Sequence, residues 1–353
     1  MVPVNGLGEK CDELIEAVNK RDSRLFSQAL EHVAEAAKRA SPGEVQDALG
    51  RLSPVLAEIP YGVGADLARL AGAMADFATD VGVVLPVLAQ RAVDAMEQAA
   101  RFAAVYGSAL GDLPEAGDPS QFQPTIARLT GAAARLGMSE REAYQLAEAW
   151  FAGGDWVQPV LYLAQRQEVR AALSGRERLI AAAEAVREHI GTAHWLYGLL
   201  MVLDDEPLTI LHRPTGRGYR VIISGIGDNF QLHTLLAARL VGDESQGLLP
   251  GEPPSSAAIA AATDGSDLTP AGGITGQFNL VDGYGQWIWN EGRPADIPQL
   301  ADERVVVLDP PPYPRSWNAG RVYPMMRPNL TVDRILTADE AADWLGLVKP
   351  AQR

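Results

Sequence analysis

The chain has 353 residues, of which 47% are hydrophobic and 21% are charged, a composition typical of a folded protein long enough to build two hydrophobic cores. Its 45 acidic residues outnumber its 30 Lys and Arg residues, giving a formal net charge of −15. Such a charge excludes binding to nucleic acid or to an anionic membrane surface unless a local basic patch overrides it. The densest basic clusters are Arg166 with Arg170 and Arg176 with Arg178. Glu168 and Glu177 are interleaved with them, so we predict solvated helix faces there.

A single cysteine, Cys11, excludes an internal disulfide, and the chain has no pair of cysteines at zinc-ligand spacing. The first residues lack a basic segment followed by an apolar run, and about 18 apolar residues never occur in succession. We therefore predict a cytoplasmic protein. Abundant Ala, Arg, Gly and Pro with little Lys suggests a GC-rich bacterial source.

From Glu9 to about Leu203, apolar residues recur at helical spacing, which predicts an Ala-rich all-α region over residues 1–203. Residues 107–124 carry three Pro and three Gly and predict an interruption that divides this region into two bundles. The spacing of the helical hairpins also fits an α-solenoid, and both arrangements remain open. A single long helix is expected over 176–203. A Ser-x-x-Glu pattern, which satisfies backbone donors at a helix start, occurs at Ser41, Ser139 and Ser174.

The composition changes at Asp204, and residues 204–353 predict a smaller α+β domain with a short mixed or antiparallel sheet. Segments 208–212 and 219–224 are expected to form a hairpin through the turn-rich residues between them. Another strand is expected near 330–336, followed by a helix that Thr337 begins, and the residues after Gly346 are expected to fray. We thus predict an α+β protein overall.

Residues 242–273 are rich in Pro, Gly, Ser and Ala and predict a flexible insertion within this domain. It is either a lid or an ordinary surface loop, with a short helix near 256–262.

The segment from Ser224 superficially suggests a dinucleotide-binding loop, because Gly225-x-Gly227 separates a strand from a helix. Phe230 replaces the third glycine, and Asp228 places a negative charge where a pyrophosphate would bind the helix start. We predict instead that Asp228 caps the helix, with Gln231 as its capping-box partner. Asp228, Asn229 and His233 are nevertheless candidate site residues, each with a structural role as the alternative.

Two further segments supply candidates. Trp287 and Trp289 share one face if their segment is a strand, where they would stack a planar ligand or cover the core. Asp309 ends a buried-type strand, and the Pro-rich loop after it has little entropy left to lose on binding. This rigid loop is the leading candidate for a functional surface that recognises a carboxylate, a phosphate or a peptide, or else it is a clamp between domains. It carries Tyr313, Arg315, Trp317, Asn318, Arg321 and Tyr323.

The sequence contains no metalloprotease, P-loop, kinase or nucleophile-elbow motif, and it indicates neither a cofactor nor a metal site. Our first hypothesis is therefore a ligand- or peptide-binding protein with a polar-aromatic pocket in the C-terminal domain. It would take a small molecule or peptide, with neither nucleic acid nor membrane as partner.

A second hypothesis is an enzyme without a cofactor motif, with tailoring or hydrolytic activity in bacterial specialised metabolism. Asp228, His233 and Asp309 would act as acid–base groups, and Arg315 or Arg321 would hold an anionic substrate. A third hypothesis is an oligomerisation, immunity or assembly module in which the helical region docks a partner protein or a second copy.

Overall fold

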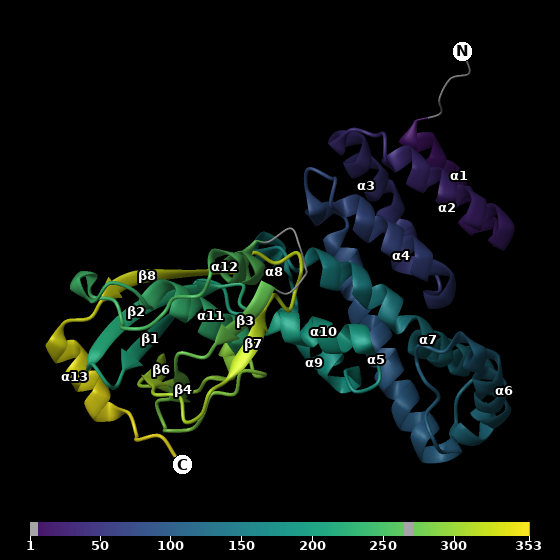
Figure 1. Ribbon diagram of the computed structural model, residues 1–353. Coiled ribbons are helices and arrows are strands. Elements are labelled where there is room, and N and C mark those ends of the chain that lie inside the picture. Colours follow the sequence, from purple (N-terminus) through teal and green to yellow (C-terminus); the bar gives the residue numbers. More distant parts are fainter. Residues whose placement is uncertain (1–5, 265–270, 353) are drawn as a thin grey trace. The chain divides into compact units, whose positions relative to one another are not determined.

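The computed structural model describes residues 6–264 and 271–352 and confirms an α+β protein. The chain divides into two compact units, residues 1–200 and 201–353, close to the change of composition at Asp204. Figure 1 traces both units, which are described separately below.

The first unit consists of helices. They are α1 (Leu7–Lys20), α2 (Ser23–Ala37), α3 (Pro42–Glu58), α4 (Tyr61–Ala75), α5 (Leu85–Leu110), α6 (Phe122–Ala132), α7 (Glu140–Leu163), α8 (Gln167–Ala172), α9 (Arg176–Val186) and α10 (Gly191–Leu200). Helix α7 packs against α4, α5, α6 and α10 and carries the buried Trp150 and Trp156. Their indole N–H groups donate to the carbonyls of Pro114 and Tyr61, so both rings are fixed as well as buried.

The predicted helix starts are confirmed, with one difference in the residue that forms the cap. Ser41 and Glu44 form both halves of a capping box, and Ser139 accepts from the N–H of Glu142. The third predicted start is that of α9, which begins at Arg176. Its cap is Gly175 in the left-handed conformation and not Ser174.

The single helix expected over 176–203 is wrong. His189 and Ile190 both donate to the carbonyl of Val186, which closes the last turn of α9, and α10 begins at Gly191. Glycine favours such a break because it is conformationally free and a poor helix former.

The second unit contains a mixed sheet in the order β4-β6-β1-β2-β8, with β5 also paired to β6. Its strands are β1 (Glu206–His212), β2 (Arg217–Ser224), β4 (Asn279–Asp282), β5 (Gln299–Leu300), β6 (Glu303–Asp309) and β8 (Asn329–Ile335). The β1–β2 hairpin and the strand near residue 330 are confirmed, β1 and β6 are parallel, and the other pairs are antiparallel. Strands β3 (Ala271–Thr275) and β7 (Ser316–Ala319) form a separate antiparallel pair.

Helices pack on both faces of the mixed sheet, so its strands bury alternate residues on opposite sides. Leu308 packs with residues of α11 (Asn229–Leu240), whereas Val307 packs with residues of α13 (Ala338–Leu347). The expected fraying after Gly346 is wrong. Val348 is buried, and the N–H groups of Lys349 and Gln352 donate to the carbonyls of Gly283 and Gly285.

The predicted insertion contains the short helix expected in it, α12 (Ser256–Thr263), which Ser255 caps. Residues 265–270 of the insertion lie outside the described residues, and its role as a lid stays a prediction.

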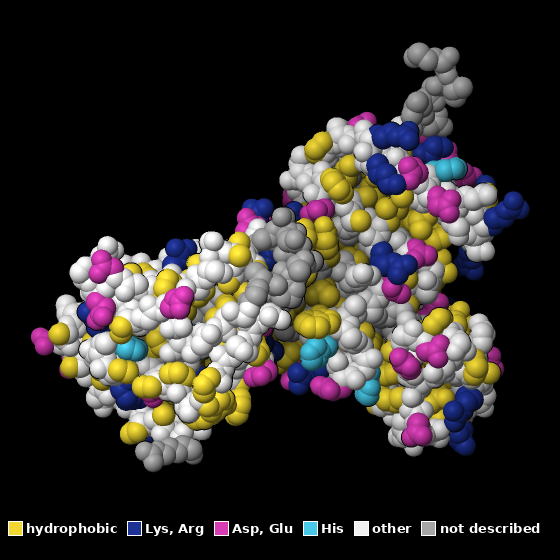
Figure 2. All heavy atoms as spheres, in the orientation of Figure 1, with side chains coloured by type: hydrophobic (Ala, Val, Ile, Leu, Met, Phe, Trp, Pro, Cys, Tyr) yellow, Lys and Arg dark blue, Asp and Glu magenta, His cyan; other side chains and the backbone are white. Residues whose placement is uncertain are grey.

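Among the described helices, none is both long and apolar enough to cross a membrane. Figure 2 shows that Lys and Arg side chains on the face drawn are scattered among acidic ones.

Candidate functional site

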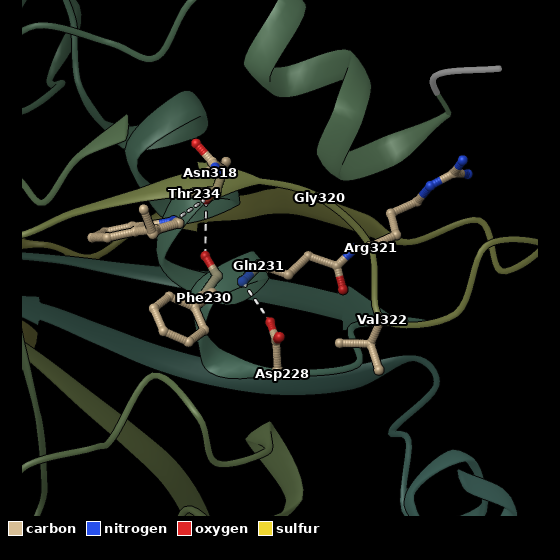
Figure 3. A pocket seen from close by; sticks show the side chains of 9 residues that line it. Asp228, Phe230, Gln231, Thr234, Asn318, Gly320, Arg321 and Val322 are labelled. Carbon is tan, nitrogen blue, oxygen red and sulfur yellow. Dashed lines mark hydrogen bonds between the residues drawn. The ribbon is translucent and has the colours of Figure 1, made fainter. Parts of the chain in front are cut away.

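A cavity of about 180 Å³ opens beside the first turn of α11. Figure 3 shows residues from the start of α11 facing residues of β7 and of the segment that follows it. The cavity is lined by Asp228, Phe230, Gln231, Thr234, Trp317, Asn318, Gly320, Arg321 and Val322.

Asp228 is held rigidly at the start of α11. Its Oδ1 accepts from the N–H of Gln231 at 2.8 Å, as expected for a helix cap. The Gln231 side chain differs from the predicted capping box, because its Oε1 accepts from the N–H of Gly227 at 2.9 Å and not from Asp228. Its Nε2 donates to the carbonyl of Ala262 at 2.7 Å, so the wall of the cavity is also tied to α12.

The carboxyl group of Asp228 is poised to change its charge near neutral pH. Burial raises its pKa to about 6. The hydrogen bonds from the N–H groups of Gln231 and Phe230 lower this pKa and the negative charge of Glu291 raises it, each more weakly than burial does. Both the acid and the carboxylate are therefore populated around pH 6, so the group can donate or accept a hydrogen bond.

Trp317 and Phe230 form an aromatic wall of the cavity. Their ring centroids lie 5.7 Å apart, and the indole Nε1–H of Trp317 donates to Oγ1 of Thr234 at 3.3 Å. The Thr234 hydroxyl donates in turn to the carbonyl of Phe230 at 2.8 Å. Because Trp317 also belongs to the β3–β7 pair, its ring is held by backbone and side-chain bonds together.

His233 lies behind this wall and does not line the cavity. It is fully buried, its ring centroid is 4.8 Å from that of Trp317, and its Nε2 accepts from the N–H of Phe278 at 3.4 Å. Burial lowers the pKa of His233 to about 3, and the positive charge of Arg315 contributes to the lowering. The interaction with the Asn290 side chain raises this pKa, but more weakly. His233 is therefore a neutral ring at physiological pH, and its basic nitrogen already has a partner.

Several buried polar atoms in this region lack well-formed hydrogen bonds. Oδ1 of Asn229 and Nε of Arg315 have no partner among the described residues, and Nδ1 of His233 and Oδ1 of Asn290 form no bond of good geometry. The Asn229 amide does donate to the carbonyl of Trp289 at 2.9 Å, so the group as a whole is only partly satisfied. Such atoms are rare in protein interiors and mark strained or functional regions.

The arginines predicted to recognise an anion already donate hydrogen bonds to other groups of the chain. Arg315 donates to the carbonyl of Phe278 at 3.0 Å and to Oδ1 of Asn279 at 3.1 Å. Arg321 lines the cavity, but its guanidinium donates to the carbonyl of Thr263 at 3.3 Å.

Asp309 lies away from the cavity. Its Oδ1 is 2.7 Å from Nε of Arg213, an ion pair in which the carboxylate is almost fully buried. Ser224 ends β2 beside the start of β1, whereas Leu308 pairs with the last residue of β1. Asp228, which follows β2, and Asp309, the last residue of β6, thus lie at opposite ends of the strands, which does not support a shared acid–base pair.

The other candidates are dispersed. Trp287 packs against the core beside α13, and Trp289 is 65% exposed, with its ring centroid 6.3 Å from that of Trp287. Tyr313 is exposed and contacts the guanidinium of Arg315. Tyr323 is buried, which raises the pKa of its phenol.

The structure thus brings four predicted residues, Asp228, Trp317, Asn318 and Arg321, to one cavity, whereas Asn229, His233 and Arg315 do not line it. Sequence reasoning missed Thr234, although it lies two turns after the capping Asp228 on the same helix. It also missed Asn290, because no spacing connects that residue with His233.

In residues 6–264 and 271–352, no group of three or more His, Cys, Asp or Glu residues is arranged to hold a metal ion. No protein-family model, curated protein or solved structure gives a significant match to the chain.

Proposed function

We propose that the C-terminal unit binds a small ligand in the cavity beside Asp228. The observation that carries this proposal is a rigid carboxyl group on the wall of a cavity that Trp317 and Phe230 also line. Most ligand sites combine apolar surface with a few fixed polar groups in this way. A cavity of about 150 Å³ can hold benzene, so about 180 Å³ suits a molecule with a single ring.

The chemistry of the wall favours a ring that carries an N–H donor. Asp228 would accept this hydrogen bond, and Trp317 and Phe230 would contact the apolar part of the ring. The guanidinium groups of Arg315 and Arg321 donate to backbone carbonyls, so they offer fewer hydrogen-bond donors to an anionic ligand than the sequence suggested.

Thermal shift and calorimetric titration with single-ring fragments, such as pyrazole, 2-aminopyridine and benzamide, test the proposal. Asp228→Asn keeps a capping side chain and removes the charge, and Trp317→Ala removes the aromatic wall. We expect the fragments that stabilise the wild type to lose affinity for both variants. Asp243→Asn is the matched control, because Asp243 is also a cap but is exposed and does not line the cavity. Equal binding to the wild type and to both cavity variants would contradict the proposal.

A second candidate function is proton transfer to or from the bound ligand. The pKa of about 6 for Asp228 suits a general acid or base, whereas His233 and Asp309 lie outside the cavity. A reaction of this kind would show a pH profile with a group near 6, lost in Asp228→Asn.

The broader setting rests on composition alone. We propose a cytoplasmic bacterial protein, and a role in specialised metabolism belongs to the enzymatic alternative. Docking of a partner protein or of a second copy by the helical unit is the third candidate, which light scattering of the purified chain would test.

A further inference from the structure

A second cavity, of about 360 Å³, lies within the helical unit, independent of the site proposed above. It is bounded by α4, by α6, by α7 and by the loop between α5 and α6. It is lined by Gly62, Ala65, Ala116, Gly117, Pro119, Phe122, Glu148, Phe151, Ala152 and Asp155.

Small and aromatic side chains together create this space. Ala65 and Ala152 leave room where α4 and α7 pack, and Phe122 and Phe151 contact each other edge to face with their ring centroids 5.4 Å apart. Both rings are half-buried, so the cavity reaches the surface between apolar walls. The loop between α5 and α6, where the sequence predicts a division into two bundles, packs on α7 through the bond from Trp150 to the carbonyl of Pro114.

One buried carboxylate faces this apolar space. Glu148 is only 6% exposed and lies against the first turn of α4, where the N–H of Gly62 bonds to it. The two positions are in close contact, because a Cβ at position 62 would lie 2.9 Å from Oε1 of Glu148. Burial raises the pKa of Glu148, while the bond from Gly62 and the more distant charge of Arg91 lower it.

Glu148 forms no salt bridge with any described residue. Arg91, whose positive charge lowers the pKa of Glu148, lies 4.2 Å from the ring centroid of Tyr61 and donates to the carbonyl of Ile59. Asp155, the other ionisable residue of the wall, is paired with Arg69 at 2.8 Å. The wall therefore presents negative charge to an apolar cavity without a cation of its own.

We propose that this cavity binds an organic cation, namely an ammonium group carried on an aromatic or branched hydrocarbon. The ammonium group donates to the carboxylate of Glu148, a charge-assisted bond in a partly dry environment. The hydrocarbon fills the space beside Phe122, Phe151 and Ala152. A free anion of the same shape is repelled by Glu148 and Asp155.

Three probes of one shape and different charge test this assignment on the unmodified full chain. Isothermal calorimetry at pH 7.5 compares 2-phenylethylamine, the neutral 2-phenylethanol and the anionic 3-phenylpropanoate. We expect the amine to bind at least about tenfold more tightly than the alcohol, and 3-phenylpropanoate not to bind. An amine no tighter than the alcohol overturns the proposal without the need for any variant.

Two substitutions separate charge from shape. Glu148→Gln should reduce amine affinity to that of the alcohol and leave the alcohol unchanged, whereas Ala152→Leu should abolish binding of both by filling the cavity. Glu142→Gln is the matched control, because Glu142 is an acid of the same helix that pairs with Arg101 outside the cavity. A retained amine preference in Glu148→Gln, or undiminished binding to Ala152→Leu, overturns the assignment.

Discussion

Replacing Asp228 with Asn should stabilise the C-terminal unit at neutral pH, although Asp228 caps α11 through a good hydrogen bond. The carboxyl group has a pKa of about 6 in the folded chain and 3.8 as its ordinary value, so folding favours its protonated form. The stability associated with this group is fully present below pH 3.8 and is lost as the pH rises through 6. Asn, which caps helices as well as Asp, has no such dependence.

The size of the effect follows from the shift. A change of about two pKa units corresponds to about 3 kcal/mol, and this net value already includes the favourable interactions of the carboxylate in the folded chain. The variant should therefore equal the wild type near pH 4 and exceed it by about 2 to 3 kcal/mol above pH 7.

Urea titrations between pH 4 and pH 8, followed through NMR cross-peaks of the C-terminal unit, measure this difference. Asp243→Asn is the control, because its effect on the free energy of unfolding should have the opposite sign. Hydrogen bonds from Ser245 lower the pKa of Asp243, so this substitution should reduce stability as the pH rises. A difference between Asp228→Asn and wild type that stays constant from pH 4 to pH 8 would refute the burial argument.

Three further predictions concern other residues. Gly72→Ala should lower the free energy of unfolding of the helical unit by about 1 to 3 kcal/mol, because a Cβ at this buried position of α4 would lie 2.7 Å from Cβ and 3.1 Å from Cα of Pro159 on α7. Gly50→Ala in the open interior of α3 should be neutral or stabilising. Thermal unfolding of both variants measures this difference, and equal effects would contradict it. His233, with a pKa of about 3, should show no change in its ring resonances from pH 8 to pH 5. Because its folded pKa lies below the ordinary 6.5, its contribution to stability is present above pH 6.5 and declines as the pH falls; a titration midpoint near 6 would contradict its burial. Asp309→Asn should destabilise the C-terminal unit by about 1 to 3 kcal/mol, because it weakens the bond to Arg213, and it should leave fragment binding unchanged. Loss of fragment binding without loss of stability would place Asp309 at the site.

Features set by neighbouring residues were predictable from the sequence. Two helix starts could be predicted because the bonding partners are three residues apart, namely Ser41 with Glu44 and Asp228 with Gln231. The β1–β2 hairpin was predictable for the same reason, since its strands and turn are contiguous. The break before Gly191 was not, because an apolar helical pattern continues across it.

Features that depend on the fold were predictable only in part. Trp317 and Arg321 were candidates because the sequence predicts a rigid Pro-rich loop there, although Trp317 lies in strand β7. Nothing in the sequence shows that Trp317 contacts His233, which is 84 residues away along the chain. Glu148 was missed altogether, because its burial depends on the packing of α7 against α4. Its partner, the N–H of Gly62, has no signature in the residue types.

The most direct test of the site at Asp228 is a two-dimensional ¹H–¹⁵N NMR titration of the full chain with the single-ring fragments. The account predicts that a ring with an N–H donor shifts the indole N–H resonance of Trp317 and the backbone N–H resonance of Gln231 together, in a saturable manner. Fragments that leave both resonances in place, or that shift only resonances of other regions, would contradict a ligand site in this cavity.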